Sequence, residues 1–589
     1  MRSRLVFDGD CGFCGWTARY AARVCGAAVE FVPYQRVLDQ HPGLSAEEFR
    51  AAVRYFAPGE RRAHLAGAAA AFRALAHAPG YGVWWWCYRR LPGFAALTEA
   101  LYRLIARHRP AAFALGRALH GTELEPARFD RIADLWTRLL GVVVVAAAAS
   151  LAVQALGLMG EHGITPIDQL ALQAEEALGA RRWWVTPSLL WFAPTDAALQ
   201  IACWAVVGCG LALAAGLRSR SLVAVAYLLW LSLLSVGQEW LSFQWDWLLL
   251  ECLFCTLFVL RGESWGAWLM RLLWFRFAFL SGVVKWTSGD LSWHDLTALG
   301  FHFETQPLPA PLAWHAAQLP LLALQALTAA TLMVELALPW LIFLGRRPRL
   351  LAAWGFIALQ TAILASGNYN YFNLLALALT LWLFDDRALG NRSQSRFPAP
   401  GKSTLMPISL CLCLMFLGAT EVWRATVQRG LPEPLEAARA ALQPFALAIG
   451  YGPFAVMTRE RIELTIEGSA DGVDWRAYRF RYKPEAGDAT LPYLAPMQPR
   501  LDWQMWFAAL GPPEQSPWVG RLLLRLLEGA PEVAALFAAD PFHGAAPRFV
   551  RVRQDQCWFA SRDERAATGA IWHCEPRGLW FGRAELRRR

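Results

Sequence analysis

Long apolar runs separated by short polar segments occupy the middle of the chain, from residue 136 to residue 423. A helix needs about 20 predominantly apolar residues to cross a bilayer, and nine runs reach or approach that length. We therefore predict a polytopic α-helical membrane core of about nine helices within residues 130–424. The runs lie at residues 136–158, 197–216, 221–238, 245–260, 266–286, 319–344, 350–366, 371–384 and 405–423.

The residues before the core follow a different pattern. Leu5 to Phe7 and Val29 to Pro33 are short apolar segments of the kind that forms strands, and a helical stretch from Trp16 to Val24 lies between them. A strand, a helix and a second strand in this order indicate a small α/β domain, which we assign to residues 1–125.

The residues after the core favour strands. Ile462, Leu464 and Ile466 alternate with polar residues, the stretch from Gly468 to Gly472 is typical of a turn, and residues 475–482 supply an aromatic-rich second strand. Further strand-like pieces follow at residues 548–558 and 571–581. We therefore predict a β-rich C-terminal domain over residues 425–589.

Composition agrees with a membrane core. The 589 residues are 56% hydrophobic and 17% charged, whereas soluble domains are nearer a quarter charged. Thirty Trp, 33 Phe and only 12 Cys exclude collagenous, disordered and small disulfide-scaffold classes. The basic residues are almost all Arg and flank apolar runs without forming one basic stripe, so we expect no nucleic-acid partner. The exceptions are Lys285, Lys402 and Lys483.

The basic residues also predict an orientation. Arg2 and Arg4 precede only three apolar residues, which is too short for a signal peptide, so we expect a cytoplasmic N-terminus. Nine spans then place ten basic residues in cytoplasmic loops against Arg181 and Arg182 outside, as the positive-inside rule requires, and place everything after residue 424 outside the cytoplasm. The ten are Arg218, Arg220, Arg261, Arg346, Arg347, Arg349, Arg387, Arg392, Arg396 and Lys402.

Cys11 and Cys14 form a Cys-x-x-Cys motif between the first predicted strand and the first predicted helix. The amides and dipole of a helix N-terminus stabilise a thiolate there, so we assign Cys11 as the attacking thiol and Cys14 as the resolving one. Asp8 precedes the motif, and its charge opposes that stabilisation if it lies close to the sulfur. The alternative is half of a zinc site, but no second ligand pair follows in this domain, and we predict neither a metal nor a cofactor.

The N-terminal 120 residues resemble the DCC family of thioredoxin-like proteins. That family opens with Asp-Gly-x-Cys-x-x-Cys, which here is Asp8 to Cys14, and residues 29–33, 67–72 and 102–109 also agree. The resemblance implies a thioredoxin-like fold and thiol–disulfide oxidoreductase chemistry, with a cytoplasmic thiol reductant as partner.

Lys285 stands at the outer end of the fifth apolar run, in a chain that uses Arg almost everywhere else. An ionisable residue at membrane depth is a candidate functional site. Desolvation can turn a lysine into a neutral amine, which arginine cannot become. The alternative is a lysine that snorkels to the membrane interface as an anchor. The candidate partners of Lys285 are Arg276, His294, His302 and Glu304.

Two further resemblances bear on this region. Residues 293–297, 302–309, 335–339, 366–370, 451–454, 499–510 and 540–542 resemble the lipase maturation factor family, over about residues 130–585. That family implies a polytopic membrane protein that helps secreted lipases reach their folded, dimeric, active state in the endoplasmic reticulum. The stretch from Gly282 to Lys285 is similar, more distantly, to the segment that holds the catalytic base lysine of the vitamin K-dependent carboxylase.

Cys557 and Cys574 lie one in each of the last two predicted strands. In an oxidising compartment the two could pair as a disulfide, and the alternative is two reduced buried thiols. The lipase maturation factor family usually has an aromatic residue at the position of Cys557, so the resemblance does not imply the disulfide.

These observations lead to one expectation and two alternatives. The Arg and Ala bias and the fused redox domain suggest a bacterial inner-membrane protein that assists the maturation of exported, lipase-like clients and exchanges thiols at Cys11 and Cys14. One alternative is a membrane-embedded enzyme that uses Lys285 as a base. The other is a non-catalytic chaperone scaffold.

Overall fold

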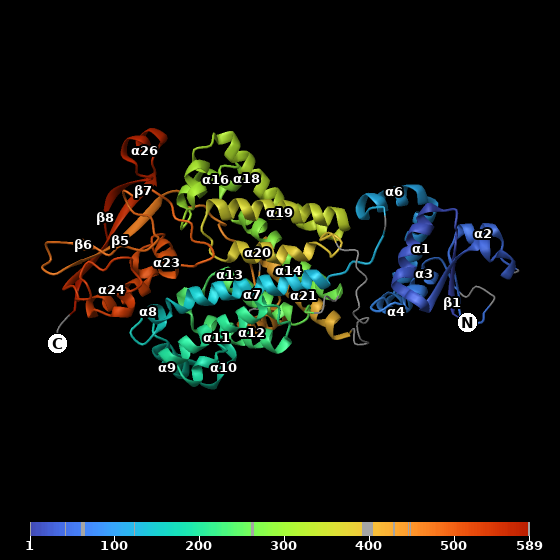
Figure 1. The fold of residues 1–589 in the computed structure, drawn as a ribbon, viewed down its shortest axis with the longest axis horizontal. Helices are drawn as coiled ribbons and strands as arrows, with labels where there is room; N and C mark the ends of the chain where they lie inside the picture. Colours follow the sequence, from blue (N-terminus) through green and yellow to red (C-terminus); the bar gives the residue numbers. More distant parts are fainter. Residues whose placement is uncertain are drawn as a thin grey trace. The chain divides into compact units, whose positions relative to one another are not determined.

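A computed structural model describes residues 2–586 apart from 42, 61–64, 123, 261–263, 391–404, 428, 429, 446 and 448. The chain divides into two compact units. The first contains Met1–Phe129, Leu341–Leu351 and Phe384–Leu410, and the second contains Asp130–Trp340, Ala352–Leu383 and Cys411–Arg589. Figure 1 labels the elements of both units.

The first unit holds a mixed four-stranded sheet in the order β2-β1-β3-β4. β1 and β2 are parallel, as a strand, helix and strand unit requires, and β3 and β4 return antiparallel. Leu5 and Val6 alternate across β1 into two separate apolar clusters, so both faces of the sheet are covered. The strands are β1 (Ser3–Phe7), β2 (Val29–Pro33), β3 (Arg54–Phe56) and β4 (Leu65–Ala66).

Six helices surround this sheet. They are α1 (Gly12–Cys25), α2 (Ala46–Ala51), α3 (Gly67–Leu75), α4 (Gly82–Arg90), α5 (Phe94–Arg107) and α6 (Arg109–His120). α1 follows β1 directly, so the predicted delivery of Cys-x-x-Cys from a strand to a helix N-terminus is present. The sheet order and the place of the motif are those of a thioredoxin-like domain.

The helical core of the second unit packs around α7, α14 and α20, which run alongside one another in Figure 1. The main helices of the nine apolar runs are α7 (Asp130–Ala152), α11 (Asp196–Ala214), α12 (Arg220–Val236), α13 (Gln244–Thr256), α14 (Ser264–Thr287), α18 (Leu321–Leu336), α19 (Arg346–Ser366), α20 (Phe372–Thr380) and α21 (Leu405–Val427). The helices between them are α8 (Ala155–Met159), α9 (Ile167–Leu178), α10 (Arg182–Val185), α15 (Leu291–His294), α16 (Ala298–Thr305) and α17 (Pro311–Ala317).

Each of the nine apolar runs is helical. Five segments of the described chain are long and apolar enough to cross a membrane, which are Asp130–Ala152, Asp196–Ala214, Gly266–Thr287, Leu321–Phe343 and Arg346–Ser366. α12 and α20 are apolar but shorter, and α13 has 13 residues. Several spanning helices make the chain a multi-pass membrane protein, while the number nine stays a prediction.

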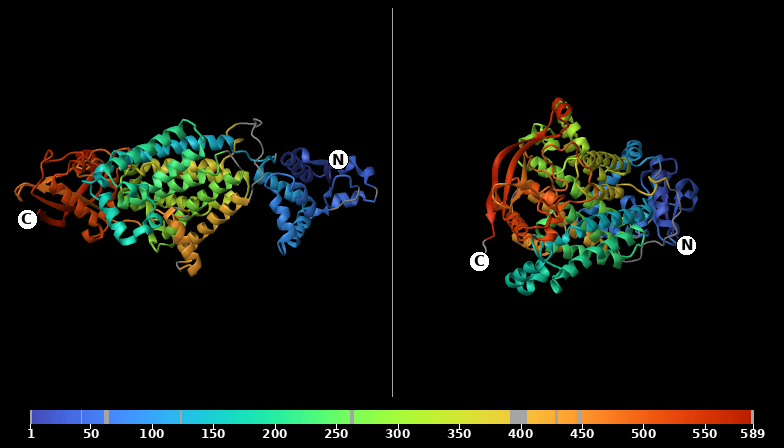
Figure 2. Two further views of the ribbon diagram at one scale, coloured as in Figure 1. Left: turned by 90° about the horizontal axis from the view of Figure 1, so that it is seen from below. Right: turned by 60° about the vertical axis from the view of Figure 1, so that its left-hand side comes forward.

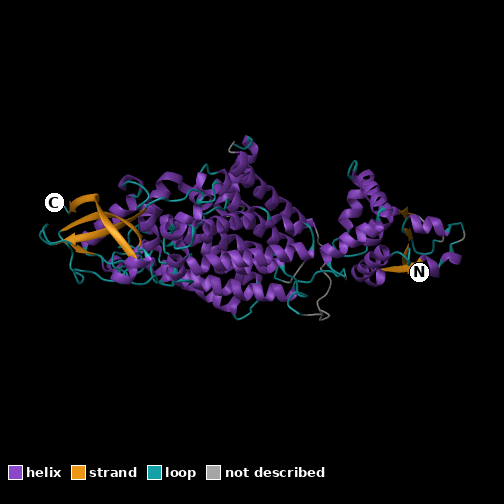
Figure 3. Cartoon of the chain, turned by 90° about the horizontal axis from the view of Figure 1, so that it is seen from above, coloured by secondary structure: helices purple, strands orange, loops and turns teal. Residues whose placement is uncertain are grey.

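The C-terminal residues of the second unit form another four-stranded sheet, in the order β6-β5-β7-β8. β5 (Arg461–Ser469) pairs antiparallel with β6 (Arg476–Ala477) and with β7 (Phe549–Phe559), as the alternation predicted, although β6 has only two residues. β8 (Trp572–Glu585) pairs with β7 through several register shifts. In Figure 2 these two strands are long and curved, and Figure 3 separates strands from helices by colour.

Helices accompany this sheet, and together the two sheets and the helical core confirm the predicted fold class. The helices that accompany the sheet are α23 (Arg500–Ala508), α24 (Pro517–Glu528), α25 (Pro531–Ala534) and α26 (Arg562–Thr568), whereas α22 (Glu433–Leu442) forms an ion pair with α21. Four of the basic residues behind the predicted orientation, Arg261, Arg392, Arg396 and Lys402, lie outside the described residues.

Candidate functional site

Cys11 caps the N-terminus of α1. Its Sγ accepts a hydrogen bond from the backbone N–H of Cys14 at 3.4 Å, and its carbonyl accepts one from Gly15. Both thiols are free; Cys11 is part-buried and Cys14 is buried. An amide aimed at the first sulfur stabilises negative charge there, so the geometry supports the attacking role predicted for Cys11.

Cys14 suits the resolving role. Burial, a hydrogen bond with Cys11 and the charge of Cys11 raise the pKa of the Cys14 thiol to about 12. Cys14 therefore stays protonated at neutral pH. The positive charge of Arg109 acts in the opposite direction.

Asp8 is held by two side chains from elsewhere in the domain. Its carboxylate accepts a hydrogen bond from Gln35 at 3.1 Å, and the Arg109 guanidinium lies 3.7 Å from it. Arg109 is in turn fixed by the carbonyls of Arg50 and Ala51. The cation that balances Asp8 comes from the start of α6, about 100 residues away, and no local pattern in the sequence links the two.

Lys285 lies in a different environment, near the C-terminal end of α14. Its ammonium donates to both carboxylate oxygens of Glu335 on α18, at 3.0 and 2.9 Å, and to the carbonyl of Ser281 at 3.0 Å. The two side chains are 6% and 7% exposed, so Lys285 is a buried ion pair and not a snorkelling anchor. Trp293 adds a cation–π contact at 5.5 Å.

This ion pair borders a large, mainly apolar cavity of about 1370 Å³. Lys285, Trp293 and His302 line one part of it, and the side chains of Tyr369 and Phe454 adjoin them. The walls continue along α18, α19 and α23. Two of the predicted residues, Lys285 and His302, therefore meet at one cavity.

His302 is neutral in this setting. Burial and the nearby Lys285 charge lower the pKa of the imidazole to about 4. Its Nε2 lies 3.3 Å from the Tyr369 hydroxyl, which donates to Gln306 Oε1 at 3.0 Å. A neutral imidazole can exchange hydrogen bonds with a ligand but adds no charge to the cavity.

The other three predicted partners lie elsewhere. Arg276 forms a buried ion pair with Glu251, which also accepts from Tyr451 at 2.7 Å. His294 is exposed and contacts the Trp286 carbonyl at 3.1 Å. The Glu304 carboxylate accepts the backbone N–H of Phe559 at 2.9 Å, which ties α16 to β7. The structure brings none of these three to the Lys285 ammonium.

Sequence reasoning did not pair Glu335 with Lys285. An acidic residue inside an apolar run was a usable signal, because a charge there requires a partner. Lys285 and Glu335 are 50 positions apart on two helices, so no local motif could pair them. Tyr369 lies within residues 366–370, which resemble the lipase maturation factor family, but its residue type did not single it out as part of a site.

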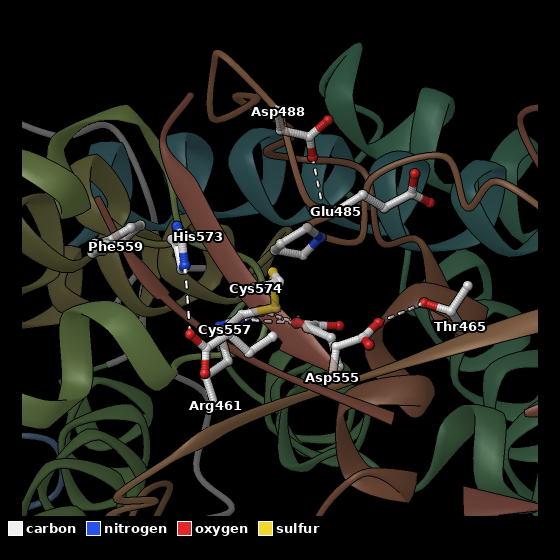
Figure 4. The surroundings of a disulfide bond; sticks show 12 residues. Arg461, Thr465, Glu485, Asp488, Asp555, Cys557, Phe559, His573 and Cys574 are labelled. Atoms are coloured by element: carbon white, nitrogen blue, oxygen red, sulfur yellow. Dashed lines mark hydrogen bonds and ion pairs between the residues drawn. A yellow bond between two sulfur atoms is a disulfide. The ribbon is translucent and has the colours of Figure 1, made fainter. Parts of the chain in front are cut away.

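Cys557 and Cys574 form a disulfide between directly opposed positions of β7 and β8 (Figure 4). Cys557 belongs to an apolar cluster with Phe303, Trp314 and Trp572, which joins the sheet to α16 and α17. The two cysteines are therefore paired as a disulfide and are not two reduced thiols. The bond lies within the sheet, beside the apolar cluster that joins the sheet to α16 and α17.

Comparison with known proteins agrees with this division of the chain. Residues 132–391 match the lipase maturation factor transmembrane domain, residues 447–581 the lipase maturation factor C-terminal domain, and residues 5–115 the DCC1-like thiol-disulfide oxidoreductase. No solved structure is a significant match.

Individual relatives are similar over most of both chains. Lipase maturation factor 2 of Homo sapiens is 34% identical over 569 residues, which cover 73% of this chain and 80% of the relative. Lipase maturation factor 1 of Bos taurus is 30% identical over 471 residues, which cover 72% and 83%. The chain therefore belongs to the lipase maturation factor family and carries a DCC1-like domain at its N-terminus.

Proposed function

We propose that this chain is a membrane-bound maturation factor that assists the folding of exported, lipase-like proteins and exchanges thiols at Cys11 and Cys14. The observation that carries the proposal is similarity to lipase maturation factors through both the helical core and the C-terminal sheet. The names of these relatives supply the client class. The proposed thiol exchange is supported by Cys11 at the N-terminus of α1, where its Sγ accepts a hydrogen bond from the Cys14 amide.

The exchange follows from the two thiols. The Cys11 thiolate attacks one sulfur of a disulfide, the old sulfur–sulfur bond breaks, and the departing sulfur leaves as a thiolate that takes a proton. Cys14 loses its proton and attacks Cys11, which releases the second substrate sulfur as a thiol. The substrate gains two electrons and two protons, and the domain becomes a Cys11–Cys14 disulfide. A cytoplasmic dithiol reductant restores the thiols by the reverse steps.

The proposal places the chain in a bacterial inner membrane, with the DCC1-like domain in the cytoplasm and the C-terminal sheet outside. Loop Arg residues support the orientation. Glu514 lies on the exposed surface of the C-terminal region, so we expect a Glu514→Cys chain to react with a membrane-impermeant thiol reagent on intact cells. Labelling equal to that of the unmodified chain would place this region inside.

The test of function is a host deleted for this protein. Exported hydrolases should lose yield and activity, and the intact chain should restore both. A chain with Cys11→Ser and Cys14→Ser should not restore them, whereas Cys87→Ser, which removes another part-buried free thiol of the same domain, should. Full rescue by the double variant would reject thiol exchange and favour the non-catalytic scaffold.

A second candidate is an enzyme in which Lys285 acts as a base. Its support is that Lys285 borders a large cavity together with His302. The lysine, however, contacts three oxygens as an ammonium would, and an ammonium has no lone pair with which to take a proton. The geometry favours a structural ion pair, and the Lys285→Arg variant discussed below distinguishes the two.

A further inference from the structure

The cavity beside Lys285 reaches the surface of the helical core between α18 and α19. Leu327 and Ala330 on α18 and Ala358 and Ala362 on α19 line it and are also exposed. These helices belong to the two least buried of the five candidate spans, with 28% and 33% of their apolar windows buried against 44–72% for the others. In a bilayer, the opening between them faces lipid chains.

The walls of the cavity are mainly apolar, as a binding site for an acyl chain requires. Val334, Leu359 and Ile363 continue the apolar lining inward, and Phe507 and Leu510 extend it along α23 and just beyond. The volume of about 1370 Å³ exceeds the roughly 300–1,000 Å³ of sites for drug-sized ligands. A long apolar molecule that enters from the membrane fits this shape and lining.

The polar end of the cavity, where Lys285 and His302 lie, carries no net charge. Glu335 neutralises Lys285, and Glu239, the other charged residue among the described lining, pairs with Arg521 at 3.3 Å. The pKa of His302, lowered to about 4, leaves its ring neutral at pH 7. A phosphate or carboxylate head group would be buried here without a free cation, which is costly.

Hydrogen bonding further defines the head group. Gln306 Nε2 donates to the carbonyls of Phe303 and Ser366, so its Oε1 accepts from the Tyr369 hydroxyl. The Tyr369 oxygen is then the acceptor for His302 Nε2–H. This tautomer leaves His302 Nδ1 as an acceptor, which suits a ligand that offers a hydroxyl proton.

We propose that the cavity binds an uncharged acyl lipid with a free hydroxyl, a diacylglycerol, with its chains between α18 and α19 and its hydroxyl at His302. The proposal does not depend on the maturation function. It requires only the cavity, its opening toward the bilayer and its neutral polar end.

The experiment uses the full chain in phosphatidylcholine nanodiscs with a diacylglycerol that carries a photoreactive group in one acyl chain. We expect cross-links to peptides of α18 and α19. Unlabelled diacylglycerol should reduce them at a concentration about tenfold lower than phosphatidylglycerol with the same chains. Equal competition by phosphatidylglycerol would reject the preference for an uncharged head group. Cross-links that unlabelled diacylglycerol does not reduce would reject the proposed binding site.

Two variants localise the ligand. Ala330→Trp fills the opening and should remove most cross-linking, while Ala329→Trp, an exposed neighbour outside the cavity, should leave it unchanged. His302→Phe should abolish the preference for diacylglycerol over its O-methyl ether, which lacks the hydroxyl proton. A preference retained in His302→Phe, or equal labelling of the two tryptophan variants, would contradict the proposal, provided that both chains elute as the unmodified chain does on size exclusion.

Discussion

The cysteine motif of the first unit and the lysine pair of the second are built in opposite ways. Cys11 and Cys14 are three residues apart, and one strand-to-helix junction suffices to place them. Lys285 and Glu335 are 50 residues apart and require two packed helices. Cys11 is part-buried and is the thiol that we propose reacts, whereas Lys285 and Glu335 are buried together as a neutral pair. We therefore expect mutations at the cysteine motif to reduce its redox activity. Mutations at Lys285 or Glu335 should instead reduce the stability of the chain.

The largest effect tests the local site. Cys11→Ser removes the nucleophile, so we expect disulfide reduction by the purified chain to fall by at least about 100-fold. Cys14→Ser should instead accumulate a mixed disulfide at Cys11, because no second thiol releases it. Initial rates and intact-mass spectrometry measure the two outcomes.

Stability provides the control for this prediction. Cys11 is at the surface end of a helix, so Cys11→Ser should leave the melting temperature of the chain within about 2 °C. A variant that lost activity by unfolding would not test the chemistry. Unchanged activity in a folded Cys11→Ser chain would show that Cys11 is not the attacking thiol.

The second prediction concerns the Lys285–Glu335 pair, where we expect stability to fall and redox activity to be retained. Glu335→Ala leaves the Lys285 ammonium buried without its carboxylate, which costs about 3–5 kcal/mol. We expect a correspondingly lower free energy of unfolding in detergent micelles, with the disulfide-reduction rate of Cys11 unaffected in the chains that remain folded.

A double variant shows whether the loss comes from the unpaired charge. Lys285→Met with Glu335→Leu replaces both charges by apolar side chains of similar size, and should recover stability to within about 2 kcal/mol of the original chain. A double variant as unstable as Glu335→Ala would mean that packing, and not charge, accounts for the loss.

The same contrast explains what the sequence could predict. Periodicity identified β1, β2, β5, β7, β8 and the nine apolar helices, because period and length are local properties, but it did not identify the short β3 and β4. The first strand, the motif and the helix that follows were all found for that reason. The two-residue β6 shows the limit, since the aromatic run at residues 475–482 predicted a longer strand than the chain pairs.

Pairing across helices was not predictable in this way. Lys285 and His302 were identified from residue type alone, and both border the cavity. Arg276, nine positions before Lys285 on α14, pairs with Glu251 on α13, whereas Lys285 pairs with Glu335 on α18. Which acidic residue meets which basic one depends on how helices pack, and a single sequence does not encode that in any local pattern.

The third prediction separates a structural lysine from a catalytic one. Lys285→Arg keeps the charge and can still contact Glu335, so we expect a loss of only about 1–3 kcal/mol from the larger side chain. Client maturation should be retained. A general base would behave otherwise, because arginine stays protonated, and activity would fall by about 10²–10⁴-fold. Activity of the rescued deletion host measures the difference.

The smallest predicted effect is a pH dependence of the long-range site. The pKa of His302 in the folded chain, about 4, lies below the ordinary value of 6.5. The stability that this difference contributes is present above pH 6.5 and is lost as the pH falls toward 4. The whole difference between these two pKa values corresponds to about 3 kcal/mol of unfolding free energy. Because the His302 side chain is part-exposed, solvent screening reduces this effect, and we expect a loss of unfolding free energy of about 1 kcal/mol.

His302→Gln tests that dependence, because glutamine can still donate to Tyr369 but does not titrate. Between pH 7 and pH 4.5, the unfolding free energy of His302→Gln should fall by about 1 kcal/mol less than that of the original chain. His294→Gln removes an exposed histidine eight positions earlier and should not change the slope. If both variants had the slope of the original chain, His302 would be protonated without cost, and the cavity would be wetter and more tolerant of charge than its lining indicates.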